Sequence, residues 1–258
     1  MNLLADRVVL VSGGTQGVGA AVVRAALRQG ATVAFSGRRA EAGESLAAQL
    51  RDAGGEVTFV QADVSDPAQA TASVQRVVEC YGRIDGLVNA AGLTTRGTLL
   101  DTTPELFDAH VAANLRGPFF TMQATVRDLV RRGEPGAIVN VITMSAHGGQ
   151  PYLAPYVASK AGLVGLTRNA AYAHRFDRIR INGLNIGWTE TEGEDAIQRR
   201  FHGADDRWRA EAAARLPMGR LGQVDEIADM VVFLLSDRSG VVTGSVIDWD
   251  QTVPGAHD

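Results

Sequence analysis

Residues 7–30 read RVVLVSGGTQGVGAAVVRAALRQG, and this stretch decides the fold class. Its first part, Arg7–Ser12, is mainly apolar and has no polar alternation, which is typical of a parallel strand covered on both faces. A glycine-rich turn follows directly, and after it an apolar helical pattern covers Gly17–Gln29. Gly30 suits the left-handed end of that helix, because glycine has no Cβ. The stretch therefore predicts a strand, a glycine turn and a helix.

The turn indicates a phosphate site. Glycines there let the backbone approach a diphosphate, whose charge is favoured at the N-terminus of the following helix. Glycine-rich turns also occur for steric reasons alone. This one, however, follows a buried strand and opens a helix within the first βαβ unit. We therefore expect a dinucleotide to bind at Gly13, Thr15, Gln16, Gly17, Val18 and Gly19.

Short apolar runs alternate with helical patterns along the rest of the chain, including a helix at about Asp225–Ser236. This alternation predicts right-handed crossovers and an α/β fold: a Rossmann-type, doubly wound parallel sheet of about seven strands with helices on both faces. No linker or repeat divides the chain, so we expect a single domain over residues 1–258. The expected strands are Arg7–Ser12, Ala31–Ser36, Val57–Gln61, Ile84–Asn89, Ala137–Ile142, Arg180–Ile186 and Ser245–Trp249.

Composition narrows the class of protein. The 258 residues are 45% hydrophobic and carry a net charge of −4 with interspersed signs, so neither nucleic acid nor a membrane surface is an expected partner. The N-terminal apolar run is too short to span a membrane and lacks a signal-peptide layout. Cys80 is the single cysteine, which we interpret as a buried, inert thiol in a reducing compartment. We expect a cytoplasmic protein.

Residues 189–216 stand apart, because they are rich in charged and aromatic residues and fit neither a strand nor one regular helix. A long irregular segment between regular elements more often has a function than none. We interpret it as a substrate-binding lid, with a solvated surface insert as the alternative.

Ordered motifs extend the argument over nearly the whole chain. The turn at 12–19 resembles the T-G-x-x-x-G-x-G pattern of the short-chain dehydrogenase/reductase family, with Ser12 in place of threonine. Further matches to that family are the N-A-G element Asn89-Ala90-Ala91-Gly92, the adenine-side motif Ala62-Asp63-Val64, the Y-x-x-x-K motif Tyr156–Lys160, and the C-terminal signatures at 217–222 and 233–237.

The resemblance implies an oxidoreductase that moves a hydride between a nicotinamide and a hydroxyl or carbonyl carbon. It also implies a homotetramer that packs partly through the helix of Tyr156. After the sixth strand the family's N-x-x-x-P-G-x-x-x-T pattern is present with Ile186 in place of proline. Besides the turn, the resemblance assigns the cofactor to Asp63, Val64, Asn89, Ala90, Ala91, Gly92, Tyr156, Lys160, Gly187, Trp188, Thr189 and Thr191.

The end of the second strand favours NADP(H) over NAD(H). An acidic residue there would bind the ribose hydroxyls and repel a 2′-phosphate. The chain instead reads Ser36-Gly37-Arg38-Arg39, with no carboxylate before Glu41. Arginine presents a permanently charged fork that suits phosphate. Two solvated loop arginines are the alternative, so NAD(H) stays open.

Tyr156 and Lys160 lie four residues apart in a helical pattern and therefore share one face. Tyrosine has a reference pKa of about 10, and we expect the ammonium and an oxidised nicotinamide to lower it into the range useful for acid–base catalysis. The family's serine, thirteen residues earlier, is Thr143 here, with Ser145 as the alternative holder of the reacting oxygen. Asn114 matches the family's proton-relay asparagine.

Polar and aromatic residues near these motifs predict the substrate. Donors, acceptors and flat rings together suit a polyhydroxylated molecule, so we expect a sugar, sugar acid or polyol, with a ketone or 3-oxoacyl substrate as the alternative. An epimerase or dehydratase and a non-catalytic dinucleotide sensor are rival functions. No cluster has metal-ligand spacing. The expected substrate contacts are Ser145, His147, Gln150, Tyr152, Trp188 and Glu190, with Glu192 also on the rim.

Overall fold

The structure, a computed structural model, describes residues 2–255 and contains one seven-stranded sheet. All neighbouring strands pair in parallel, in the order β3-β2-β1-β4-β5-β6-β7. The expected doubly wound parallel sheet is thereby confirmed, with strand ends shifted by two residues at most. The strands are β1 Val8–Ser12, β2 Thr32–Gly37, β3 Val57–Gln61, β4 Gly86–Asn89, β5 Gly136–Val141, β6 Ile179–Ile186 and β7 Val246–Trp249.

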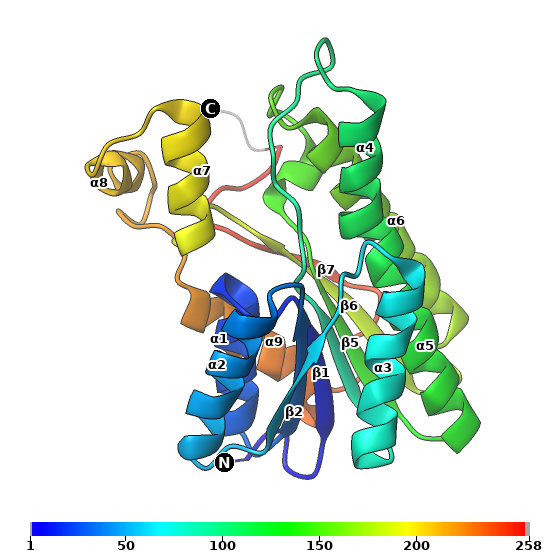
Figure 1. Cartoon of the computed structure of the whole chain (residues 1–258). Helices are drawn as coiled ribbons and strands as arrows, with labels where there is room; N and C mark the ends of the chain where they lie inside the picture. Colours follow the sequence, from blue (N-terminus) through cyan, green and yellow to red (C-terminus); the bar gives the residue numbers. More distant parts are fainter. Residues whose placement is uncertain (1, 256–258) are drawn as a thin grey trace.

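Helices cover both faces of the sheet, as Figure 1 shows. On one face lie α1 (Gly17–Arg28), α2 (Ala40–Asp52) and α9 (Val224–Leu235). The other face carries α3 (Pro67–Tyr81), α5 (Gly117–Arg132) and α6 (Ala154–Ala173), and α4 (Pro104–Val111) packs on α6. Short segments complete the layers: a π-helical turn η1 (Ala112–Arg116) and two 3₁₀ turns, η2 (Met144–His147) and η3 (Asp237–Ser239).

The apolar run of β1 explains why the sheet needs both layers. Val9 and Val11 belong to the core beneath α1 and α9, whereas Val8 and Leu10 belong to the core beneath α3 and α5. Successive strand residues point to opposite faces, so a strand without polar alternation is stable only where both faces are covered.

The strand order positions the site. The chain passes outward from β1 through β2 to β3 and then returns to β4 on the other side of β1. The loops that leave β1 and β4 therefore diverge at the carboxyl edge, and a crevice opens between them. Ser12 and Asn89, the last residues of these two strands, are paired neighbours in the sheet.

Cys80 corrects one expectation, because it is exposed rather than buried. In the last turn of α3 the packed side passes through Val78 and Tyr81, which contact the core. Cys80 then lies on the solvent side of the same turn. Over residues 2–255, none of the helices is both long and apolar enough to cross a membrane.

The segment 189–216 contains two short helices, α7 (Glu192–His202) and α8 (Trp208–Ala213), in agreement with its lack of one regular pattern. Figure 1 shows both beyond the layer of α1 and α2, at the carboxyl end of the strands. Thr191 caps α7 by accepting the backbone N–H of Glu194 at 2.9 Å. Trp208 is buried with Ala212 and Leu221, which gives the segment a small apolar core of its own.

Candidate active site

A cavity of about 1280 Å³ opens at the carboxyl edge of the sheet. Its walls come from the loops after β1, β2, β4, β5 and β6, from α6 and from the segment 189–216. Sites for drug-sized ligands usually measure roughly 300–1,000 Å³. This cavity therefore has room for a large molecule, such as a dinucleotide, and a small second one.

The glycine turn fits a diphosphate. Gly13 has a φ of +84°, and a Cβ there would lie 2.4 Å from the backbone nitrogen of Ala91, so only glycine allows this approach of the two loops. Gly17 has a φ of +52° at the start of α1. The N-cap residue Gln16 makes no side-chain capping bond, which leaves the first N–H groups of α1 for another acceptor. Free N–H groups and the helix dipole favour an anion there.

The end of β2 forms the far wall of the cavity, with Ser36, Arg38 and Arg39 in its lining. The Ser36 hydroxyl is buried and has no hydrogen-bond partner within residues 2–255. Arg39 donates to the side-chain oxygen of Gln16 and so joins this wall to the glycine turn. An unpartnered hydroxyl and two guanidinium groups fit a polar, anionic part of a ligand.

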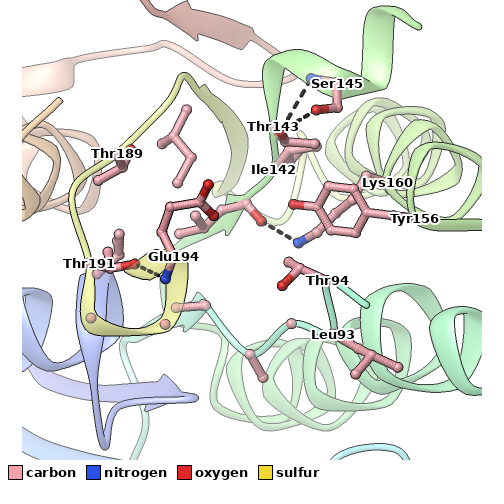
Figure 2. A pocket seen from close by; sticks show the side chains of 18 of the residues that line it. Leu93, Thr94, Ile142, Thr143, Ser145, Tyr156, Lys160, Thr189, Thr191 and Glu194 are labelled. Carbon is pink, nitrogen blue, oxygen red and sulfur yellow. Dashed lines mark hydrogen bonds between the residues drawn. The ribbon is translucent and has the colours of Figure 1, made fainter. Parts of the chain in front are cut away.

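Tyr156 and Lys160 lie one turn apart on α6, and both side chains reach the cavity although the residues are only 9% and 4% exposed. Figure 2 shows the phenol and the amine side by side. The Lys160 ammonium donates to the backbone oxygen of Val141 at 2.9 Å, which fixes it at the end of β5. The helix therefore presents a proton-carrying hydroxyl and a cation to the same space.

Burial sets the pKa of both groups. It raises the pKa of Tyr156 to about 12, with a smaller increase from the charge of Glu194, while a Thr143 hydrogen bond and the charge of Arg96 act in the opposite direction. Burial also lowers the pKa of Lys160 to about 8. The net shift of the tyrosine pKa is upward, because desolvation outweighs the favourable hydrogen bond and charge beside the phenol. The lowering that we expect from Lys160 together with an oxidised nicotinamide stays a prediction.

Thr143 is the hydroxyl that the structure brings to the phenol. Its Oγ1 also lies 3.3 Å from Oγ of Ser145, and Ser145 in turn donates to Oε1 of Gln150 at 2.8 Å. Figure 2 shows Thr143 between Ser145 and the tyrosine ring. Ser145 therefore belongs to the same wall of the cavity but is one hydrogen bond further from Tyr156.

Asn114 is fully buried in the π-helical turn η1 rather than in a regular helix. Its Oδ1 accepts the N–H of Leu93 at 2.8 Å, and its Nδ2 donates to the Leu93 oxygen and to Oγ of Ser159, both at 3.0 Å. The side chain thus ties the loop after β4 to α6. Single π turns in helices are frequent at functional sites, and this one holds Asn114 against the Tyr156 helix.

The cavity lining includes Ser145, His147, Gln150, Tyr152 and Trp188, five of the residues that we expect to contact the substrate. His147 Nε2 lies 2.9 Å from Oδ1 of Asp248 on β7, and Asn185 donates to the same oxygen at 2.7 Å. The imidazole is therefore held in place by β6 and β7.

Four expected residues do not line the cavity. Asn89 is buried below it, where it donates to Asn140 at 2.9 Å and accepts from Thr121 at 2.7 Å. Asn114 also lies behind the wall. Glu190 is held outside by Arg209 at 3.2 Å and by Gln223 at 3.2 Å, and the rim residue Glu192 is outside as well. The remaining expected residues all lie in the lining.

Other residues line the cavity without having been expected: Arg96, Glu194, Gln198, His202, Asp250 and Thr252. They belong to loops, to α7 and to the C-terminal tail, and no motif marked them. For the residues on α7, the only indication in the sequence was the high content of charged residues in the segment 189–216. Within residues 2–255, no group of three or more His, Cys, Asp or Glu side chains is arranged to hold a metal ion.

Known proteins resemble this chain over nearly its full length. The family model described as enoyl-(acyl carrier protein) reductase matches residues 13–252. An L-rhamnose 1-dehydrogenase (NAD(P)(+)) of Azotobacter vinelandii is 36% identical, covering 94% of each chain. A 3-oxoacyl-(acyl-carrier-protein) reductase of Thermotoga maritima is 34% identical, covering 96% of this chain and 97% of the other. A crystal structure of a variant actinorhodin polyketide ketoreductase with NADPH has a TM-score of 0.91 at 30% identity and covers 97% of this chain and 98% of its own.

Proposed function

The chain belongs to the short-chain dehydrogenase/reductase family, and from that premise we propose that it is an NADP(H)-preferring dehydrogenase of a sugar, sugar acid or polyol. It is an oxidoreductase that acts on CH–OH groups. One observation carries the proposal: Tyr156, Thr143 and Lys160 meet in the wall of a cavity whose other end is the glycine turn. A 3-oxoacyl or ketone substrate is the second candidate, favoured by the identity to the reductase of Thermotoga maritima.

The chemistry follows from these side chains. A bound nicotinamide dinucleotide supplies the acceptor of the hydride. Thr143 and Tyr156 hold the substrate hydroxyl between their oxygens, and Tyr156 takes its proton while the carbon loses hydrogen with both electrons and becomes a carbonyl. Lys160 favours the deprotonated phenol by its charge and would bind the ribose of a nicotinamide dinucleotide. Asn114 keeps the loop after β4 against α6 and so preserves the spacing of these groups.

The cofactor preference rests on the wall at the end of β2. Arg38 and Arg39 supply positive charge there, and no acidic residue occurs between Ser36 and Glu41. A 2′-phosphate gains a charged partner in this wall, whereas the unphosphorylated ribose loses the carboxylate that usually receives its hydroxyls. Apart from Asn89, which is buried below it, the remaining cofactor residues expected from the motifs, from Asp63 to Thr191, surround the same cavity.

The segment 189–216 acts as the lid in this proposal. It contributes α7 to the cavity wall, and its Trp208 stacks on Trp188, the wall residue just before the segment, with ring centroids 6.1 Å apart. We also propose a homotetramer that packs through α4, α5 and α6, since Phe107, Phe119 and Tyr172 on these helices are exposed. Large exposed apolar side chains gathered on one face favour association. The free Cys80 suits a reducing cytoplasm.

A dehydrogenase screen tests the function. Sugars, polyols and hydroxy acids are offered with NADP⁺ and with NAD⁺, and stoichiometric NADPH formation is measured. Tyr156→Phe is expected to reduce kcat at least about 100-fold while NADPH fluorescence shows unchanged cofactor affinity. Full activity of this variant refutes the assignment of Tyr156. Turnover without net NADPH formation supports an epimerase or dehydratase instead.

A further inference from the structure

Arg96 lies in the loop between β4 and α4 and lines the substrate end of the cavity. Its guanidinium is fixed from several sides. One nitrogen donates to the backbone oxygen of Thr94 at 2.9 Å, and two others lie 3.2 Å from Nε2 of His202. The group also lies over the Tyr152 ring, 5.4 Å from its centroid. A planar guanidinium held in this way is preorganised, so little rotational freedom is lost when a ligand binds it.

The charge of Arg96 has no ionic partner among the described residues. Its neighbours are a carbonyl, an aromatic ring and an imidazole nitrogen that accepts a hydrogen bond. The nearby arginines of the lid are different, since Arg209 pairs with Glu190 and Asp195, and Arg199 pairs with Asp195 and Asp206. A guanidinium that keeps only neutral partners beside a ligand cavity is suited to an anion from outside.

Arg96 also acts on the catalytic centre, because its charge lowers the pKa of the Tyr156 phenol. Arg96, Tyr156 and Thr143 line the same cavity, so an anion bound at Arg96 shares that cavity with the hydroxyl groups of the catalytic centre. Glu194 faces the same space from α7, as Figure 2 shows. Its negative charge disfavours a dianionic phosphate more strongly than a single carboxylate.

We propose that Arg96 binds the carboxylate of the substrate, which makes that substrate a short hydroxy acid. The carboxylate replaces His202 at the guanidinium fork, and the carbinol carbon reaches Tyr156 and Thr143. Gln150 has Oε1 engaged by Ser145 and keeps Nε2 for a further hydroxyl. This inference rests on the proposed dehydrogenase function and narrows its substrate class. The reaction converts the hydroxy acid to a keto acid, with hydride passing to the dinucleotide and the proton to Tyr156.

Matched pairs of substrates test the inference on the full chain with NADP⁺ and NAD⁺. The pairs are lactate and propane-1,2-diol, 3-hydroxybutyrate and butane-1,3-diol, and gluconate and glucitol, so each pair exchanges a carboxylate for a hydroxymethyl group. The phosphate alternative is represented by 6-phosphogluconate. We expect kcat/KM for the best acid to exceed that of its neutral partner at least about tenfold, the size of one charged hydrogen bond.

Arg96→Gln is expected to reduce this acid-to-alcohol ratio about 10- to 100-fold, and Arg96→Lys to retain part of it, since lysine keeps the charge but not the fork. Arg24→Gln, an exposed arginine on α1 outside the cavity, is the matched control and leaves the ratio unchanged. Calorimetry of the best acid with the cofactor-loaded protein gives a readout independent of turnover, with the same loss of affinity in Arg96→Gln.

Equal losses for acids and alcohols in Arg96→Gln overturn the inference, as does a preference for neutral sugars or for 6-phosphogluconate. The dehydrogenase function then stands on the neutral substrates. If no probe is oxidised, calorimetric titration measures the affinity of the protein for gluconate, lactate and 3-hydroxybutyrate. Equal affinities of the wild type and Arg96→Gln for these acids overturn the carboxylate site. Absence of dinucleotide binding, in contrast, overturns the proposed function itself.

Discussion

Replacing Lys160 by methionine is expected to stabilise the cofactor-free protein while it removes activity. Lys160 is 4% exposed, and burial lowers its pKa from 10.5 to about 8. That difference corresponds to about 3 kcal/mol of free energy that opposes folding at pH 7, because the ammonium loses its hydration. Methionine has a similar shape and no charge, but it leaves the Val141 oxygen without its donor, a loss of about 1 kcal/mol. The expected net gain is about 2 kcal/mol, or about 4 °C in Tm for a chain of this length.

The pH dependence separates this cause from a general effect on packing. The folded-state pKa of Lys160 lies below its unfolded-state value, so between pH 8 and 10.5 the unfolded chain binds more protons. The wild type therefore gains stability relative to Lys160→Met over this window, and the advantage of the variant shrinks. Differential scanning calorimetry at pH 7, 9 and 10.5 measures it. A variant that is less stable at pH 7, or whose advantage is constant with pH, refutes the reasoning.

Three substitutions test the rest of the site. Arg38→Asp is expected to weaken NADP⁺ far more than NAD⁺, by about 10- to 100-fold in the ratio of their dissociation constants, and an unchanged ratio contradicts the assigned preference. Thr143→Val is expected to reduce kcat about 100-fold and Thr143→Ser to restore it, as measured by steady-state kinetics; equal rates in both variants point to Ser145. Gly13→Ala places a Cβ 2.4 Å from the Ala91 nitrogen, so fluorescence titration should show at least about tenfold weaker NADPH binding, whereas wild-type affinity means that the two loops separate easily.

The central strands, such as β1, were predictable because they are buried on both faces and so read as apolar runs. Val57–Gln61 matches β3 at both ends. The motifs located the cavity wall because the glycine turn and the Tyr156 helix depend on local geometry that a few residues specify. Helix ends, such as the last turn of α3 with Cys80, were less certain, because a side chain there faces core or solvent according to small differences in packing.

The lid residues show what sequence cannot give. Glu190 and Glu194 are both acidic and lie four residues apart in the sequence, yet only Glu194 lines the cavity. Thr191 caps the start of α7, so Glu194 lies within the helix and Glu190 lies before it. Arg209 from α8 then holds Glu190 outside the cavity. Arg96 likewise reaches the cavity only because its loop, Tyr152 and the end of α7 converge in three dimensions. Such contacts depend on tertiary packing and leave no characteristic residue spacing in the sequence.

The direction of the Tyr156 pKa shift has a consequence for how the site works. Burial acts on both members of the pair toward their neutral forms, since it raises the phenol pKa to about 12 and lowers the amine pKa to about 8. Burial therefore favours the protonated phenol, which is the form that donates a proton to a carbonyl oxygen. Oxidation requires positive charge beside the phenol, and in the proposed function the Lys160 ammonium on the same face of α6 contributes to it. The Y-x-x-x-K motif identified Tyr156 and Lys160. Their protonation also depends on burial, which only the folded structure reveals.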